Sequence, residues 1–492
     1  MKLEQLVFNN TYVKLGESFF SRVLPTPMVD PYLVAFNPQA AGLIDLDPSE
    51  SSRPEFLQYF SGQILFKGAD PVAMVYAGHQ FGVQVPRLGD GRAILLGEVS
   101  NGNAHWDLQL KGSGLTPYSR MGDGRAVLRS SIREYLCGEA MFALGIPTTR
   151  TLCIVGSEEK VFREETESRA VITRMAPCHV RFGSFEYFQN RDVQTLADYV
   201  IAEHFPEIQA AFESGAERYC AWFSEVTRRT ARLIAQWQAV GFSHGVMNTD
   251  NMSILGLTLD YGPYGFMEEF DFGFVCNHSD EQGRYAFSQQ PGIGLWNLNV
   301  LAHSLSGLMS RDHLVSALQT YEPAFHEEYS KLFRAKLGLT QNQDTDEKLI
   351  SDLLSVMEQG HVDHTNFFRT LGKLKLEPDE VNEKIFSDFF GFPRQDWRQW
   401  TKQYRARLQS EGATPEQDSP RRARMNLANP KFILRNHLAQ RAIDAAVKNK
   451  DYSEIENLLQ VLHHPFDEQP ESEKYALLPG DGEKNIQVSC SS

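Results

Sequence analysis

The chain has 492 residues and a formal net charge of −15, with 42% hydrophobic and 23% charged residues. This length allows two or three domains, and the composition is that of an ordinary globular protein. The acidic balance argues against a broad nucleic-acid surface, which needs concentrated basic charge, so we expect no nucleic-acid partner. No apolar run reaches the roughly 20 residues that span a bilayer, so we also expect no membrane partner.

The cysteines and the N-terminal sequence indicate the cellular compartment. The six cysteines are scattered and form no C-x-x-C pair, which excludes the usual compact zinc spacings. The first ten residues lack the apolar core of a secretory signal. A reduced, cytoplasmic location is therefore the expectation.

Residues 1–75 have a mixed pattern and are predicted to form an N-terminal extension. The chain then turns to strands. Apolar residues alternate over 81–85, the sequence Leu88-Gly-Asp-Gly91 is typical of a tight turn, and 92–99 is predicted to be the returning strand.

A third strand is predicted over 105–111, with one apolar face and one polar face that ends in Lys111. A glycine-rich hairpin followed by such a strand is the order of parts with which protein kinases hold nucleotide phosphates. A plain antiparallel meander with a solvated lysine would have the same pattern. Both interpretations are open at this point of the chain.

A helix is predicted over 128–144, entered from the glycine-rich turn Gly122-Asp-Gly-Arg125. Backbone amides at such an entrance form an anion site. Glu134 lies off the apolar stripe of this helix, where a kinase-type site needs a carboxylate to hold Lys111. Glu139 is a competitor, and an exposed helix carboxylate is the simpler explanation of either residue.

Two further strands are predicted over 149–155 and 168–175, and Pro177 ends the second one. Arg174 and Arg181 flank this point. Arginines are mostly exposed, so their position alone favours solvated surface residues.

A helix with an apolar face over 222–240 leads into the stretch from His244 to Asn251. Protein kinases carry H-R-D-x-x-x-x-N at such a junction, and Asn251 is in register with the asparagine of that motif. Val246 stands where the kinase has its catalytic aspartate, and valine cannot accept a proton. Either the chain has lost this chemistry, or Asp250 has taken it over.

Asp260 is the predicted partner of Asn251 in a metal site. It closes the hydrophobic segment 254–259, which is short enough for one hairpin to bring the two side chains together. Their oxygens are the hard ligands that magnesium prefers, although an aspartate that merely begins a turn is the alternative. A literal Asp271-Phe-Gly273 also occurs, but in an acidic run that is more typical of a surface loop.

These stretches together resemble the SelO (selenoprotein O) family of kinase-fold proteins, and the resemblance covers nearly the whole chain. The stretches that carry it are Gly78–Gly82, Leu88–Arg92, Gln109–Gly112, Gly122–Arg125, His244–Asn251, Leu259–Pro263 and the terminal Cys490-Ser-Ser492. The resemblance implies an α+β, protein-kinase-like bilobal fold. We expect a β-rich N-lobe over 76–177, a helical C-lobe with the catalytic and metal loops over 178–445, and a C-terminal helix and tail over 446–492.

The resemblance also implies an activity. The family is known for transferring AMP from ATP to protein hydroxyls, with release of pyrophosphate, and UMP transfer from UTP is attributed to its bacterial branch. In it the nucleotide lies inverted relative to a kinase and presents its α-phosphate for attack. The expected partners are proteins with Ser, Thr or Tyr hydroxyls, including the enzyme itself, and the expected cofactor is Mg²⁺ or Mn²⁺.

The resemblance assigns roles to individual residues. Asp250 becomes the proton acceptor, and Asn251 and Asp260 become the metal ligands. The expected nucleotide contacts are Gly89, Gly91, Arg92, Lys111 with its partner Glu134, Asp123, Gly124, Arg174, Arg181 and Asp260. Cys276 and Cys490 are an implied redox pair, whereas cysteine statistics alone favour an exposed thiol in the tail. Cys490 stands where many eukaryotic members carry selenocysteine, and 478–483 departs from an expected segment with Pro and Trp.

Two other functions fit part of the pattern. A small-molecule or protein phosphotransferase would explain His244-Gly245, but Val246 removes the base it needs. A catalytically inactive nucleotide-binding scaffold would explain Val246, and it gives Asp250 no role.

Overall fold

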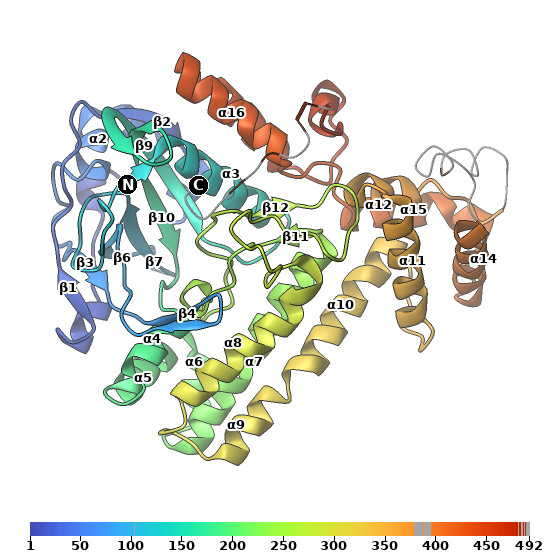
Figure 1. Ribbon diagram of the computed structural model, residues 1–492, viewed down its shortest axis with the longest axis horizontal. Helices are drawn as coiled ribbons and strands as arrows, with labels where there is room; N and C mark the ends of the chain where they lie inside the picture. Colours follow the sequence, from blue (N-terminus) through green and yellow to red (C-terminus); the bar gives the residue numbers. More distant parts are fainter. Residues whose placement is uncertain are drawn as a thin grey trace.

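The computed structural model describes residues 1–102, 104–377, 386, 395–480, 482–483, 486 and 488. Figure 1 shows a sheet on one side of the molecule and long helices below it and on the other side. The predicted α+β class, with a β-rich part followed by a helical part, is confirmed at this level. In the described part of the chain, no helix is long and apolar enough to cross a membrane.

The main sheet has eight strands, and every pair in it is antiparallel. Its order is β1-β3-β6-β7-β10-β9-β2, and β8 pairs with β10 off this path. The strands are β1 (Phe20–Arg22), β2 (Tyr32–Phe36), β3 (Val72–Met74), β6 (Ala93–Ser100), β7 (His105–Lys111), β8 (Ala126–Val127), β9 (Arg150–Phe162) and β10 (Thr166–Ala176). Strands β1, β2 and β3 come from residues 1–75, so the expected N-terminal extension takes part in the sheet.

The two faces of the sheet have different neighbours. Leu108 and Leu110 of β7 face a core that includes residues of the short helices α1 (Pro38–Gly42) and α2 (Pro54–Phe60). The opposite face carries Gln109 and Lys111, because successive strand residues alternate between faces. Helix α3 (Leu128–Ala143) covers part of this second face and joins the core that contains Ile154 and Ile172.

The helical part follows the sheet. Figure 1 shows α7, α8, α9 and α10 running together below the sheet, with α11, α12, α14 and α15 at the far side. The helices are α4 (Phe182–Phe188), α5 (Val193–His204), α6 (Pro206–Ala211), α7 (Ala216–Ala239), α8 (Gln290–Ser304), α9 (Arg311–Leu318), α10 (Tyr321–Leu337), α11 (Asp346–Gly360), α12 (His364–Leu371), α14 (Gln395–Ser410), α15 (Asp418–Ala428), α16 (Asn436–Asn449) and α17 (Ser453–Leu462).

The predicted strand over 81–85 is wrong in its boundaries and its pairing. Strands β4 (Gly78–Gln80) and β5 (Val83–Val85) form a separate hairpin, and its turn is Phe81-Gly82 with φ of 51° and 82°. Strand β6 pairs with β3 and β7 instead of β5. The turn is held from a distant part of the chain, because the Phe81 N–H donates to Asn248 Oδ1 at 3.1 Å.

The predicted hairpin between Asn251 and Asp260 is also wrong. Residues 252–259 have no strand, and the segment is held by single bridges from Ser253 to Arg181 and from Thr258 to Thr148. The Thr258 N–H donates to the Pro147 carbonyl at 2.8 Å. The segment therefore follows neighbouring loops rather than folding on itself.

Candidate active site

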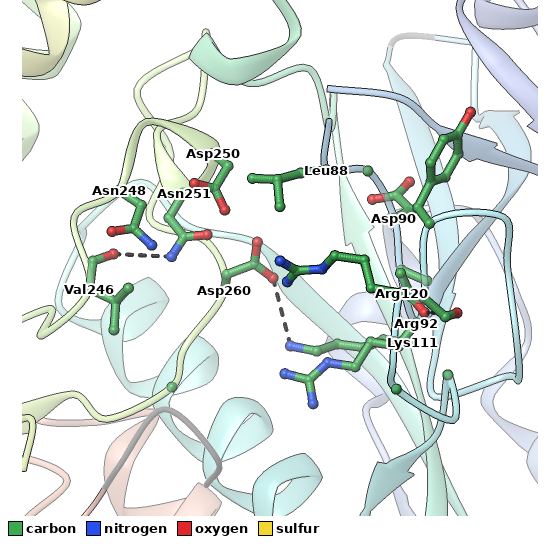
Figure 2. A pocket seen from close by; sticks show the side chains of 18 of the residues that line it. Leu88, Asp90, Arg92, Lys111, Arg120, Val246, Asn248, Asp250, Asn251 and Asp260 are labelled. Carbon is green, nitrogen blue, oxygen red and sulfur yellow. Dashed lines mark hydrogen bonds and ion pairs between the residues drawn. The ribbon is translucent and has the colours of Figure 1, made fainter. Parts of the chain in front are cut away.

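Most of the charged residues to which the sequence analysis gave a role in nucleotide or metal binding line one cavity of about 650 Å³. The cavity lies between two parts of the chain. One is the face of the sheet that carries Lys111, and the other is the loop that follows β11 (Phe242–Ser243) and precedes β12 (Gly265–Phe266). Figure 2 shows Lys111, Arg92 and Arg120 on one side of the cavity and Asn251, Asp250 and Asp260 on the other.

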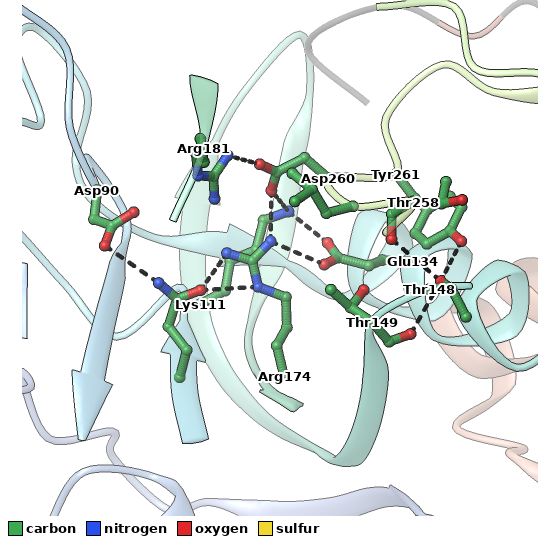
Figure 3. A network of polar contacts seen from close by, with 12 residues as sticks. Asp90, Lys111, Glu134, Thr148, Thr149, Arg174, Arg181, Thr258, Asp260 and Tyr261 are labelled. Carbon is green, nitrogen blue, oxygen red and sulfur yellow. Dashed lines mark hydrogen bonds and ion pairs between the residues drawn. The ribbon is translucent and has the colours of Figure 1, made fainter. Parts of the chain in front are cut away.

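Asp260 is the centre of an ion-pair network at the buried end of the cavity. Its carboxylate accepts from Arg174 Nη1 at 2.5 Å and from Arg181 Nη1, and it lies 3.7 Å from Lys111 Nζ. Figure 3 shows these groups converging on Asp260. Burial opposes the charge on Asp260, but the two guanidinium groups and the lysine hold its pKa well below the usual range.

Glu134 completes this network. It accepts from Lys111 Nζ at 2.5 Å and lies 3.4 Å from Arg174 Nη1. Arg174 and Glu134 are only 2% and 3% exposed, which excludes the alternatives of a solvated arginine and an exposed helix carboxylate. The competitor Glu139 pairs with Arg150 instead, at 2.7 Å.

Strand register explains why Arg174 points into the cavity. Arg174 in β10 is directly opposite Gln109 in β7, so both side chains leave the sheet on the same face. The Arg174 guanidinium donates to Gln109 Oε1, and Gln109 Nε2 donates to Asp90 Oδ2 at 3.2 Å. A chain of polar contacts thus links the glycine-rich turn to Arg174.

The loop after β11 presents Asp250 to the cavity. Asp250 is 8% exposed, and burial raises its pKa to about 6. Its Oδ2 accepts from Gln80 Nε2 at 3.1 Å, and its Oδ1 has no hydrogen-bond partner among the described residues. The carboxylate therefore has one oxygen held by Gln80 and one buried oxygen that lies against Gly78.

The oxygens of Asn251 and Asp260 fit a divalent cation. Asn251 Nδ2 donates to the Val246 carbonyl at 3.1 Å, which leaves its Oδ1 as the atom available to a metal. No cluster of three or more His, Cys, Asp or Glu residues suited to a metal occurs within the described ranges. Magnesium is often held by one or two protein oxygens together with substrate phosphates and water, so two ligands suffice.

All of the predicted nucleotide contacts except Glu134 line the cavity. Its lining includes Gly89, Gly91, Arg92, Lys111, Asp123, Gly124, Arg174, Arg181 and Asp260. Glu134 reaches it only through Lys111 and Arg174. Asp271 does not line it, and its Oδ1 accepts from the Gly273 N–H at 2.7 Å in a local turn.

The predicted redox pair is only half described. Cys276 is buried in a second cavity of about 850 Å³, and its thiol donates to the Pro263 carbonyl at 2.8 Å. Burial raises the pKa of this thiol to about 12. Cys490 lies outside the described residues, so the pairing stays a prediction.

Comparisons with known proteins give the family. A family model described as "Protein adenylyltransferase SelO" matches residues 2–463. The protein nucleotidyltransferase YdiU of Myxococcus xanthus is 55% identical over 495 residues, which cover 100% of this chain and 99% of that protein. The protein of the same name from Thioalkalivibrio sulfidiphilus is 53% identical over 504 residues, with 100% of both chains covered.

The chain belongs to the SelO family.

Three residues in or next to the cavity of this SelO-family chain were missed by the sequence analysis. Gln109 does not line the cavity but accepts from Arg174, and its place on the polar face of the predicted strand 105–111 was the signal for it. Gln80 lies within Gly78–Gly82, a stretch that the analysis used for the resemblance without giving it a role. Arg120 lines the cavity with a φ of 53°, a backbone conformation that no pattern in the sequence predicts.

Proposed function

We propose that this chain is a protein nucleotidyltransferase that transfers AMP from ATP, or UMP from UTP, to Ser, Thr or Tyr hydroxyls of proteins, including its own. Membership in the SelO family supports this activity, since the family model carries the description protein adenylyltransferase. A protein-kinase-like bilobal fold, with lobes over 76–177 and 178–445, agrees with the sheet, the helical part and the Lys111–Glu134 pair.

One observation carries the proposal. Val246 occupies the position of the kinase base, and Asp250, whose carboxylate is largely buried, lines the cavity four positions later. A kinase-type site without a base at 246 is poorly suited to attack at the γ-phosphorus. A relocated base suits attack at a different phosphorus atom.

The mechanism follows from the charges. The acceptor hydroxyl oxygen attacks the α-phosphorus of the nucleotide while its proton passes to the Asp250 carboxylate. The bond between the α-phosphorus and the bridging oxygen breaks, and pyrophosphate leaves with the bonding electrons. Lys111, Arg174 and Arg181 stabilise the charge of this leaving group, and charge-assisted hydrogen bonds of this kind are strong.

These cations support an inverted nucleotide. Arg174 and Arg181 are 2% and 3% exposed, so the positive charge lies at the buried end of the cavity. A triphosphate would place its terminal phosphates there. A divalent cation held by Asn251 and Asp260 would neutralise phosphate charge and polarise the phosphoryl oxygen.

Asp250→Ala tests the proposal. We expect ATP affinity to stay within about twofold, because a base does not hold the nucleotide, and transfer of AMP to protein to fall by roughly 100-fold or more. Titration calorimetry and single-turnover transfer measure the two quantities. Wild-type transfer in the variant would contradict the base assignment, and ATP binding without any transfer by the wild-type chain would favour the inactive scaffold.

A further inference from the structure

The β4–β5 hairpin touches the Asp250 loop through consecutive residues. The His79 N–H donates to Thr249 Oγ1 at 2.7 Å, Gln80 Nε2 donates to Asp250 Oδ2 at 3.1 Å, and the Phe81 N–H donates to Asn248 Oδ1. The hairpin precedes this loop by about 170 positions in the chain. Its contacts are therefore tertiary, and they end on the predicted base.

The hairpin acts on the two oxygens of Asp250 in different ways. Gln80 holds Oδ2, whereas Oδ1 has no partner in the described part of the chain. A Cβ atom at Gly78 would lie 2.6 Å from Oδ1, so any side chain there would crowd this oxygen. The sequence Gly78-His-Gln80 thus fixes Oδ2 and leaves just enough room for the buried Oδ1 against Gly78.

The turn of the hairpin, which directly follows Gln80, is strained. Phe81 has a φ of 51°, which is rare for a bulky residue, and the surrounding structure holds it there. Its N–H donates both to Asn248 Oδ1 and to the Tyr285 hydroxyl, each at 3.1 Å. Strained backbone of this kind persists where neighbouring contacts enforce it, often at functional sites.

We propose that Gln80 is a positioning residue that orients the Asp250 carboxylate, so that Oδ2, the oxygen that is not buried against Gly78, can receive the proton of the acceptor hydroxyl. This inference rests on the proposed role of Asp250 as the base. The carboxylate would otherwise rotate about its terminal torsion, which is broad for aspartate. A fixed oxygen raises the fraction of molecules that are ready for proton transfer.

The test is a double-mutant cycle with Gln80→Met and Asp250→Ala. Methionine has nearly the length of glutamine but cannot donate to Oδ2. Gln84→Met is the matched control, because Gln84 is exposed and lies opposite His79 in the same hairpin, away from the base. ATP affinity and single-turnover transfer of α-labelled AMP are measured for each variant, with the unfolding temperature as a check on folding.

We expect Gln80→Met to lower transfer by about 10-fold, as the loss of a hydrogen bond to a charged group predicts, with ATP affinity unchanged. In the Asp250→Ala background the same substitution should have no effect, because there is no carboxylate left to orient. Gln84→Met should transfer AMP as the wild-type chain does.

Equal losses in both backgrounds, a loss of ATP affinity that matches the loss of transfer, or no loss at all would overturn the positioning role. In those cases a large effect of Asp250→Ala would leave the proposed function intact. Wild-type transfer by Asp250→Ala would instead remove the base itself, so the two failures are distinguishable.

Discussion

Asp260 accepts ion pairs from two arginines and lies close to a lysine, and it is also the predicted ligand of a divalent cation. These roles compete for the same oxygens. If a triphosphate and its metal bind as proposed, the cations of the cavity would gain phosphate oxygens as partners, and Asp260 would be available to hold the metal. Before the nucleotide arrives, the Asp260 carboxylate therefore offsets part of the positive charge of Lys111, Arg174 and Arg181.

Asp260→Asn should separate these roles. We expect nucleotide affinity in Mg²⁺ to fall by roughly 5-fold or more, since a single charge–charge contact is worth about 1 kcal/mol even in water. In EDTA the affinity should stay the same or rise, because the cations lose a carboxylate that repels phosphate. Calorimetric titration with ATP in both conditions measures this. Asp271→Asn is the control, and a variant that keeps the full effect of Mg²⁺ would contradict the metal assignment.

At the level of single residues, the sequence indicates chemistry better than it indicates burial. The spacing from His244 to Asn251 makes Asp250 a candidate base from a local motif alone, and Asp250 lines the cavity. Arg174 and Arg181 look like surface residues because their acidic partner, Asp260, lies about 80 positions away. Only the register of β10 against β7 shows that Arg174 faces the cavity.

Among the elements, strands β6 and β7 carry a buried carboxyl pair. Glu98 and Asp107 are directly opposite each other, and Asp107 Oδ2 lies 2.9 Å from His179 Nδ1. Burial raises the pKa of Asp107 to about 8, and burial together with Asp107 raises that of Glu98 to about 7. In the unfolded chain both values return to about 4.

This pair should make the folded state less stable at high pH. Because the folded pKa values are raised, the folded state keeps protons that the unfolded state has released. The contribution of this carboxyl pair to the free energy of unfolding should therefore be fully present below about pH 4. It should decline as the pH rises towards 8. Asp107→Asn should reduce the fall in Tm between pH 5 and pH 8.5 by at least about 2 °C, measured by calorimetry.

Asp30→Asn is the control for this prediction, since Asp30 is exposed and has a φ of 44° that asparagine also tolerates. It should leave the pH dependence of Tm unchanged. An Asp107→Asn protein with the pH dependence of the wild-type chain would show that Asp107 is not protonated in the fold.

Elements with local signals were predicted correctly, and elements set by distant contacts were not. Helix α3 was expected over 128–144 from its apolar periodicity, and it is Leu128–Ala143. The alternation over 81–85 predicted one strand, but contacts to Asn248 and Tyr285 impose a turn at Phe81. No pattern within a single segment contains that information.

The C-terminal helices α16 and α17 pack against helix α3, which lies on the sheet. Figure 1 shows α16 close to α3, beside the sheet. Leu438 and Ile443 of α16 share a core with Ile132 and Leu136 of α3. Since α3 also carries Glu134, the far end of the chain supports the helix that holds Lys111.

Ile443→Ala tests this support. Ile443 is 2% exposed, and truncating a buried isoleucine costs about 2–5 kcal/mol. We expect a clear fall in Tm in thermal unfolding. Val447→Ala in the same helix is the control, because Val447 is 47% exposed and should change stability by no more than about 0.5 kcal/mol. Equal effects of the two substitutions would contradict the packing of α16 in the core.

Labelled ATP tests the central claim most directly. The wild-type chain is incubated with Mg²⁺ and ATP carrying label on either the α- or the γ-phosphate, and the label on protein is counted. The account predicts that α-label appears on protein in step with free pyrophosphate, and that γ-label does not, because Val246 leaves no base for attack at the γ-phosphorus. Protein labelled from the γ-phosphate would contradict it and favour a phosphotransferase.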